Sequence, residues 1–168
     1  MKSILTILAV ILSFAVYAQS DTLYMHNGKK VTGNVKKVGE HTVSFTYQNE
    51  DVEQVLGKYT ILKIIYAKSG RLQEITPKIR VKSEEDWENV IIVENLEEIA
   101  GLKRVDEIRG KSAFISYRTG AGADNKALKS LKKEAASMKC PFVLITSEQD
   151  RKYGQNQAIK RGIAYSYE

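Results

Sequence analysis

The chain has 168 residues, and its 26 Lys and Arg against 20 Asp and Glu give a formal net charge of +6. Such a modest positive excess is typical of a soluble surface and argues against a nucleic-acid groove. The one cysteine, Cys140, excludes an intramolecular disulfide, so stability must come from packed apolar cores.

The N-terminus, residues 1–18, has the pattern of a secretory signal peptide. A short basic start precedes an apolar run from Ile4 to Tyr17, which is shorter than the about 20 apolar residues that span a membrane. Val16 and Ala18 occupy the −3 and −1 positions of a cleavage site. We therefore expect cleavage after Ala18 and an exported mature chain, periplasmic or extracellular, with no transmembrane segment. An uncleaved membrane anchor is the alternative.

Residues 21–76 show period-two alternation interrupted by turn residues, which is typical of short antiparallel strands. Asn27 and Gly28 predict a type I′ hairpin, because both residues tolerate the positive φ that this turn needs. Short strands without a helix predict a small antiparallel β-barrel. The predicted strands are Thr22–His26, Val31–Val38, Thr42–Tyr47, Val52–Leu56, Ile61–Tyr66 and Arg71–Ile75.

A change of pattern marks a boundary between two domains. Pro77 cannot donate to a β-ladder, and Ser83 can cap a short helical turn that includes Trp87. We therefore assign residues 77–85 to a linker, followed by a second domain of residues 86–168. Trp87, beside the linker, could staple the two halves together.

The second domain is expected to be α+β, with one helix packed on a sheet of about five strands. The helix is predicted to begin after Asp124, its N-cap, and to end near Lys139, before Pro141. Its core-facing stripe is Leu128, Leu131, Ala135 and Met138. The predicted strands are Val90–Val93, Lys103–Ile108, Ser112–Tyr117, Phe142–Thr146 and Ala158–Tyr167, with a turn at residues 109–111.

The loop from Thr119 to Asp124 and the helix after it hold the candidate contact residues. A glycine-containing loop that opens a helix presents free N–H groups to an anion; a flexible connector is the alternative. Lysines along the exposed helix face favour contact with a lipid or polyanion, and a solvated face is the alternative. The candidate ligand or partner contacts are Gly120, Gly122, Lys126, Lys129 and Lys133.

Catalytic motifs are not recognisable in this sequence. It contains no serine elbow, no phosphate loop ending in Lys-Ser or Lys-Thr, and no histidine pair at helical ligand spacing. His26 and His41 lie at strand ends beside turns, where we expect them to be exposed; the alternative is a metal pair completed by Glu40 or Glu53. Cys140 precedes an apolar run, which favours a buried structural thiol over an intermolecular bridge or a reactive role. We therefore assign no residue to catalysis, a cofactor or a metal.

Two glycines separated by four residues, Gly28 and Gly33, stand in the hairpin from Leu23 to Val35. This hairpin resembles the opening of Sm-like barrels, which implies an SH3-like or Sm-like fold. The Asp and Asn that contact RNA in that family have no match at residues 39–41, so RNA binding is not implied. The arrangement also resembles small β domains in exported proteins of Bacteroidetes-type bacteria.

The second half contains strand motifs and a helix of the Leu-Lys-x-x-Ala-Ala kind, at Val90–Val93, Gly101–Val105, Ile108–Ser112, Ala127–Ala136 and Val143–Thr146. This arrangement is similar to the YbjQ-type heavy-metal-binding-domain superfamily. It also resembles the envelope stress-sensing lipoprotein of the Rcs pathway. The resemblance implies a compact α+β fold more than an activity. The disulfide cysteines of the stress sensor are absent, and no metal-ligand cluster replaces them.

These patterns predict an exported, non-enzymatic protein of the cell envelope or the secreted fraction, which binds a protein or a surface polymer and no nucleic acid. Two alternatives stay open. One is a module that binds a small ligand or a metal in the α+β half, and the other is an enzyme with a site between the domains. A pocket with convergent acids and a histidine would favour the enzyme, whereas a shallow surface would favour an interaction.

Overall fold

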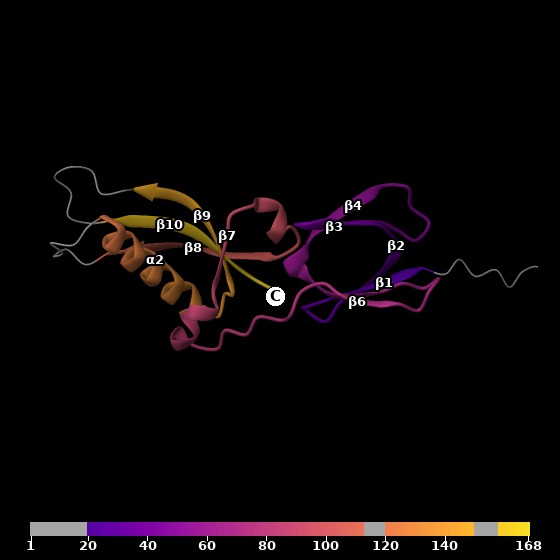
Figure 1. Cartoon of the computed structure of the whole chain (residues 1–168), viewed down its shortest axis with the longest axis horizontal. Helices are drawn as coiled ribbons and strands as arrows, with labels where there is room; N and C mark the ends of the chain where they lie inside the picture. Colours follow the sequence, from indigo (N-terminus) through magenta and orange to yellow (C-terminus); the bar gives the residue numbers. More distant parts are fainter. Residues whose placement is uncertain (1–19, 113–119, 150–157) are drawn as a thin grey trace, which may run out of the picture.

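The structure is a computed structural model of the chain and describes residues 20–112, 120–149 and 158–168. Two β-sheets lie end to end along the long axis of the molecule, and one α-helix packs against the second sheet (Figure 1). This arrangement confirms the predicted α+β class. The predicted signal peptide, residues 1–18, lies outside the described residues, so export stays a prediction.

The first sheet has six antiparallel strands in the order β4-β3-β2-β1-β5-β6. Inward-facing Leu23, Phe45 and Ile64 are at most 1% exposed and form part of its core. β4 and β6 stand at the two ends of an open sheet, so the predicted barrel is not confirmed. The elements are β1 (Asp21–Met25), β2 (Lys30–Val38), β3 (Thr42–Tyr47), β4 (Glu53–Gly57), the 3-10 turn η1 (Lys58–Thr60), β5 (Ile61–Ile65) and β6 (Leu72–Glu74).

The turn between β1 and β2 differs from the predicted type I′ hairpin. Gly28 has a positive φ of 87°, but Asn27 does not have a positive φ. Instead, the Asn27 side chain accepts a hydrogen bond from Lys29 N (3.0 Å), and Met25 N donates to Lys29 O (2.9 Å). The asparagine carboxamide thus stabilises a longer loop, and the predicted type I′ turn is wrong.

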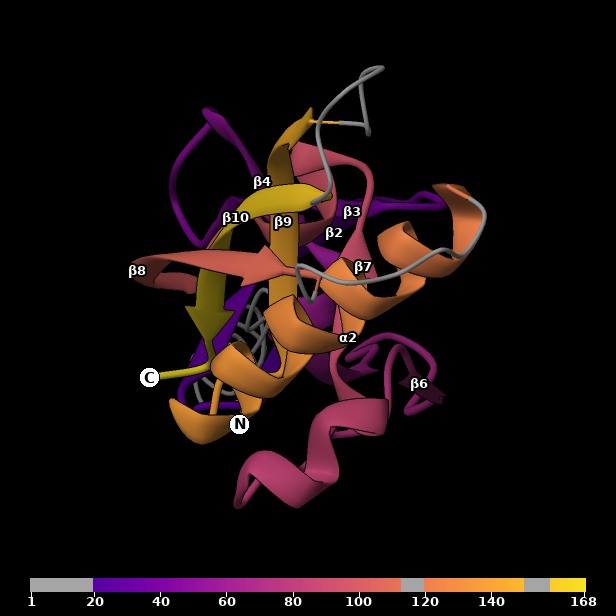
Figure 2. The same cartoon turned by 90° about the vertical axis from the view of Figure 1, so that its left-hand side faces the viewer.

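The second sheet has four strands in the order β7-β9-β10-β8, with β7 parallel to β9 and the other pairs antiparallel. Helix α2 (Gly120–Ser137) packs across this sheet (Figure 2). Its residues at four-residue spacing, Ala123, Ala127, Leu131 and Ala135, are at most 1% exposed. The strands are β7 (Ile91–Val93), β8 (Lys103–Lys111), β9 (Phe142–Gln149) and β10 (Ile159–Ser166), and two 3-10 helices, η2 (Glu84–Asn89) and η3 (Leu96–Ile99), flank β7.

Helix α2 begins and ends earlier than predicted. Residues 120–123 are helical, so Asp124 is not the N-cap; Ala123 is buried in a cluster that includes Ala158, which favours this additional turn. Met138 lies beyond the last helical residue and is 37% exposed, so its place in the predicted stripe is wrong. The chain leaves the helix through Lys139, whose φ of 59° is left-handed.

Strand β8 runs without interruption through residues 109–111, where a turn was predicted. A Cβ atom on Gly110 would clash with the carbonyl oxygen of Ala127. Gly110 therefore marks the place where the backbones of β8 and α2 approach closely. A glycine in a strand can serve such a close approach as well as a turn or bulge. The predicted division into two strands is wrong at this point, and residues 113–117 of the second predicted strand lie outside the described residues.

Ser83 is the N-cap residue of η2, as predicted. The ring of Trp87 in η2 packs against the apolar cluster beneath α2, and the Nζ atom of Lys129 lies 4.4 Å from its centroid. Trp87 therefore joins η2 to α2 within the second half and does not staple the two halves together. No described helix combines the length and the apolar character needed to cross a bilayer.

Candidate functional site

An apolar cluster joins the two sheets. Phe142 of β9 is fully buried, and its ring centroid lies 4.8 Å from that of Tyr59 in η1. Beside this pair, the Thr60 hydroxyl donates to Ala100 O at 2.9 Å. The two halves therefore share packing and hydrogen bonds, whereas the predicted division at residues 77–85 stays a prediction about folding units.

His26 and Tyr167 form a second contact between the halves, with ring centroids 4.7 Å apart. His26 is 4% exposed, so the predicted solvent exposure of this residue is wrong: the C-terminal segment covers the end of β1. Its Nε2 atom lies 2.9 Å from the Thr76 hydroxyl, whereas its buried Nδ1 atom has no hydrogen-bond partner among the described residues. Burial, together with the Lys78 ammonium, lowers the pKa of His26 and favours the neutral ring.

Residues 78–82 connect the halves and form a segment that we call the strap. Exposed Lys78, Arg80 and Lys82 alternate with Ile79 and Val81, which pack into the apolar clusters below. This period-two burial is that of a β-strand, although the strap belongs to neither sheet. The strap is fixed to the C-terminal segment because Ile79 N donates to the Tyr167 hydroxyl oxygen at 3.1 Å.

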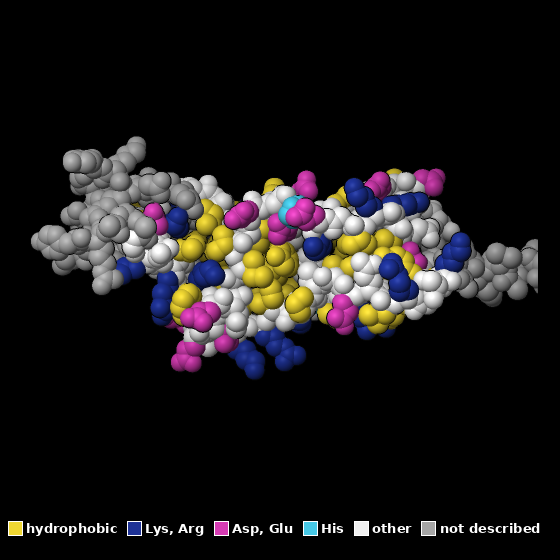
Figure 3. All heavy atoms as spheres, viewed as in Figure 1, with side chains coloured by type: hydrophobic (Ala, Val, Ile, Leu, Met, Phe, Trp, Pro, Cys, Tyr) yellow, Lys and Arg dark blue, Asp and Glu magenta, His cyan; other side chains and the backbone are white. Residues whose placement is uncertain are grey.

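A groove of about 600 Å³ lies beside the strap. It is lined by the strap, by Met138, Lys139 and Pro141 after helix α2, and by residues 166–168. Figure 3 shows apolar side chains gathered at the junction of the two halves, with Lys and Arg side chains below them in this view. The lining of the groove itself includes apolar Ile79, Val81 and Pro141, which we call its floor, and charged side chains, which we call its border.

The charge of this border is mainly positive. Lys78, Arg80, Lys82 and Lys139 line the groove, and Glu168 is the acidic side chain among the lining residues. The first of these cations donates to His26 O at 2.9 Å, whereas the other three are exposed and make no side-chain hydrogen bond or ion pair within the described residues. Three cations are therefore free to meet an anionic partner above an apolar floor.

The contact residues predicted from the sequence lie away from this groove. Gly120 and Gly122 lie in the first turn of α2, and Lys126 is exposed farther along the helix. Lys129 lies over the Trp87 ring, as described above, and Lys133 Nζ is 2.7 Å from a carboxylate oxygen of Glu84 in η2. Lys129 and Lys133 border a separate hollow between α2 and η2. Whether any of these residues contacts a partner stays a prediction.

Sequence reasoning missed the strap, although the printed sequence carries a signal for it. Residues 78–82 alternate basic and β-branched apolar side chains, the pattern of a half-buried strand. Their position between two predicted domains led to the interpretation as a linker.

The two other candidate residues, His41 and Cys140, do not line the groove. His41 Nδ1 lies 3.0 Å from Glu98 Oε1, and its side chain is 37% exposed. Within residues 20–112, 120–149 and 158–168, no three His, Cys, Asp or Glu side chains are grouped so that they could hold a metal ion. Cys140 is fully buried, as predicted, and burial raises the pKa of its thiol, which keeps it protonated.

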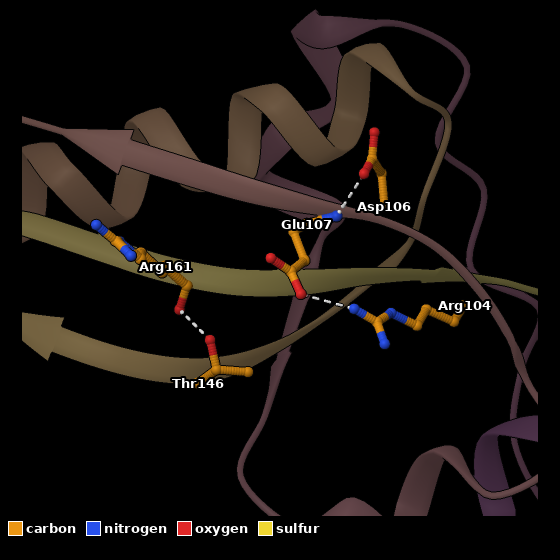
Figure 4. A network of polar contacts seen from close by, with 5 residues as sticks. All are labelled: Arg104, Asp106, Glu107, Thr146 and Arg161. Carbon is orange, nitrogen blue, oxygen red and sulfur yellow. Dashed lines mark hydrogen bonds and ion pairs between the residues drawn. The ribbon is translucent and has the colours of Figure 1, made fainter.

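A polar network on the second sheet is a weaker candidate (Figure 4). Arg104 Nη2 lies 2.7 Å from Glu107 Oε1, a separation of three residues that would place the two on opposite faces of a regular strand. The pairing of β8 with β10 passes over Val105, so a bulge there brings both side chains to one side. Both side chains are more than half exposed, so the ion pair adds little stability. Neither residue lines the groove.

A scan against protein-family models, a search of curated proteins and a search of solved structures each found no match to this chain.

Proposed function

We propose that this chain is an exported, non-enzymatic binding protein of the cell envelope or the secreted fraction, and that its partner presents negative charge to the groove beside the strap. The observation that carries the proposal is the row of exposed cations above the apolar floor, Arg80, Lys82 and Lys139, whose side chains make no hydrogen bond or ion pair with another described residue. The predicted signal peptide supports export. The Sm-like and YbjQ-type resemblances remain proposals about the fold and do not bear on the groove.

The groove favours an interaction over catalysis. Apart from the C-terminal Glu168, its lining offers cations, apolar groups, a serine and the Tyr167 hydroxyl, which accepts a hydrogen bond from Ile79 N. The buried His26 is not among the lining residues. An acid–base pair needs a proton donor and acceptor within reach of one substrate atom, and the lining side chains provide no histidine for that role. Its lining suits a partner that is recognised by charge and apolar contact.

The test is a titration of the mature protein with two soluble polyanions, poly-glutamate and a sulfated polysaccharide. Each exposed ion pair contributes roughly 0.5 kcal/mol, so the triple variant Arg80→Gln, Lys82→Gln and Lys139→Gln is expected to weaken binding about tenfold. Added salt is expected to weaken it further, because the charges are exposed to solvent.

The matched control removes three exposed lysines of β2 and the turn before it, Lys29→Gln, Lys36→Gln and Lys37→Gln. The net charge of the two triple variants is the same, so the control is expected to bind like the wild type. Equal losses in both variants would show a diffuse charge effect and no site. A wild-type protein that binds neither polyanion would contradict the proposed function.

A further inference from the structure

We propose that the partner is an extended polypeptide segment with acidic and apolar side chains in alternation, which pairs as an added strand with the backbone of the strap. This inference rests on the proposed function, because it names the partner of the same strap cations. It follows from three features of the strap: its conformation, its unpaired backbone groups and the spacing of its charges.

The strap already has the geometry of a strand. Lys78, Arg80 and Lys82 are exposed while Ile79 and Val81 pack into the molecule, so burial alternates as it does along a β-strand. The inward residues are held in the apolar cluster beneath α2 and in the cluster that joins the two sheets, and Ile79 N is fixed to the Tyr167 hydroxyl. A partner strand would therefore meet a segment that is already ordered, which lowers the entropic cost of binding.

Several backbone groups of the strap have no hydrogen-bond partner in the part of the chain that the structure describes. Within the strap, Ile79 N donates to Tyr167 and Lys82 N donates to the Asp86 carboxylate at 2.8 Å. The described residues contain no backbone-to-backbone hydrogen bond to residues 78–81. In an extended chain the N–H and C=O groups of Lys78 and Arg80 point to the same side, opposite to the Ile79 N–H that meets Tyr167. Such an edge can accept an added strand, the recognition mode in which main-chain hydrogen bonds supply affinity.

Charge spacing defines the side chains of the partner. Alternate residues of a strand are about 6.7 Å apart, so the cations of the strap repeat at the same interval as alternate side chains of any paired strand. Side chains directly opposite each other lie on one face of the pair. Acidic residues of the partner would therefore stand beside Arg80 and Lys82, while its intervening residues would lie on the same face of the pair as Ile79 and Val81. A polysaccharide would meet the same cations but has no backbone amides to pair with the strap.

The experiment uses the mature full-length protein and two synthetic peptides of identical composition. One alternates Glu and Val, and the other has the same residues in two blocks. The sulfated polysaccharide is the third probe. We expect the alternating peptide to bind about tenfold more tightly than the block peptide. On binding, hydrogen exchange at the amides of Lys78 and Arg80 should slow by at least about tenfold, because both gain a partner.

Two variants at one position separate backbone pairing from charge. Arg80→Gln removes the charge and is expected to weaken the alternating peptide by a few-fold. Arg80→Pro also removes the N–H donor and is expected to abolish the preference for the alternating peptide over the block peptide. Circular dichroism melting shows whether the proline variant remains folded. If the proline variant does not fold, hydrogen exchange at the Lys78 and Arg80 amides of the wild type decides whether the backbone pairs with the peptide.

The outcomes distinguish this inference from the function on which it rests. If the polysaccharide binds and the two peptides bind equally, or bind without protecting the two amides, the groove is a polyanion site and the added-strand inference is wrong. If none of the three probes binds, the proposed function fails as well. Preference for the alternating peptide together with protection of Lys78 and Arg80 supports both.

Discussion

Truncation of Tyr167 tests whether the junction that frames the groove is held as the structure indicates. The Tyr167 ring contacts the rings of His26 and Phe142, at centroid distances of 4.7 and 5.4 Å, and its hydroxyl accepts a hydrogen bond from Ile79 N. Burial raises the pKa of this phenol, which keeps the hydroxyl protonated at neutral pH. The side chain thus links the first sheet, the second sheet and the strap.

The expected losses of stability follow from these contacts. Tyr167→Phe removes one hydrogen bond and leaves a backbone N–H without its partner, which costs about 1–2 kcal/mol. Tyr167→Ala also removes the two ring contacts, worth roughly 0.5–1.5 kcal/mol each, and part of the apolar burial. We expect a total loss of about 3 kcal/mol for the alanine variant, at the lower end of the range for aromatic truncation because the ring is half-buried.

Urea unfolding of the mature protein measures both losses, and hydrogen exchange at the Ile79 amide reports the strap directly. Tyr47→Phe is the matched control, since Tyr47 is 40% exposed and no hydrogen bond of its hydroxyl is found among the described residues. The amide of Ile79 is expected to exchange faster in both Tyr167 variants. Its exchange rate is expected to stay the same in the control. If Tyr167→Ala costs no more than Tyr47→Phe, or leaves the Ile79 amide protected, the proposed junction is wrong.

Three further measurements test the core, the pH dependence and the division of the chain. Leu131→Ala is expected to cost about 2–5 kcal/mol, because Leu131 is fully buried against the sheet, whereas Lys126→Ala on the exposed helix face is expected to be nearly neutral; equal melting temperatures would contradict the helix phase. The lowered pKa of His26 means that its contribution to stability is present above about pH 6.5 and is lost as the pH falls through the folded-state pKa, by at most about 1.4 kcal/mol per pH unit. Urea unfolding at about pH 7.5 and about pH 5.5 should show this dependence in the wild type and not in His26→Asn; a dependence that persists in the variant would belong to other groups. A fragment that begins at Ser83 is expected to unfold cooperatively but at a lower temperature than the whole chain, because it keeps most of the cluster beneath α2 and loses the Tyr59 contact; a non-cooperative melt by circular dichroism would show that the halves form one folding unit.

Local patterns in the sequence predicted the structure correctly where the conformation depends on residues close together in the chain. The third strand, Thr42–Tyr47, has the predicted bounds, since Val43 and Phe45 alternate with polar residues and turn residues flank the segment. Ser83 caps η2 as predicted, for the same local reason. The burial of Leu131 also follows from local spacing, because a helix with apolar residues on one face must place that face on a core.

Predictions failed where a distant segment determines the local conformation. Gly110 looked like a turn residue between basic neighbours, but its missing side chain allows α2 to approach β8. Residues 120–123 looked like a flexible loop, but burial of Ala123 favours one more helical turn. In both cases the packing of α2 on the second sheet overrode the local signal, and that packing cannot be read from a short window of sequence.

The candidate groove depends on the same kind of long-range contact. Ile79 and Tyr167 are 88 residues apart, yet the hydroxyl of one fixes the backbone of the other. His26 looked exposed because its neighbours form a turn, and it is buried because the C-terminal Tyr167 covers it. The Tyr167 side chain both covers His26 and holds the strap through Ile79 N. A change that separates the two sheets at Tyr167 must therefore also release the strap, which lines the groove. Stability of the junction and affinity for an anionic partner should therefore fall together in the Tyr167 variants, whereas Leu131→Ala should lower stability alone as long as the protein remains folded.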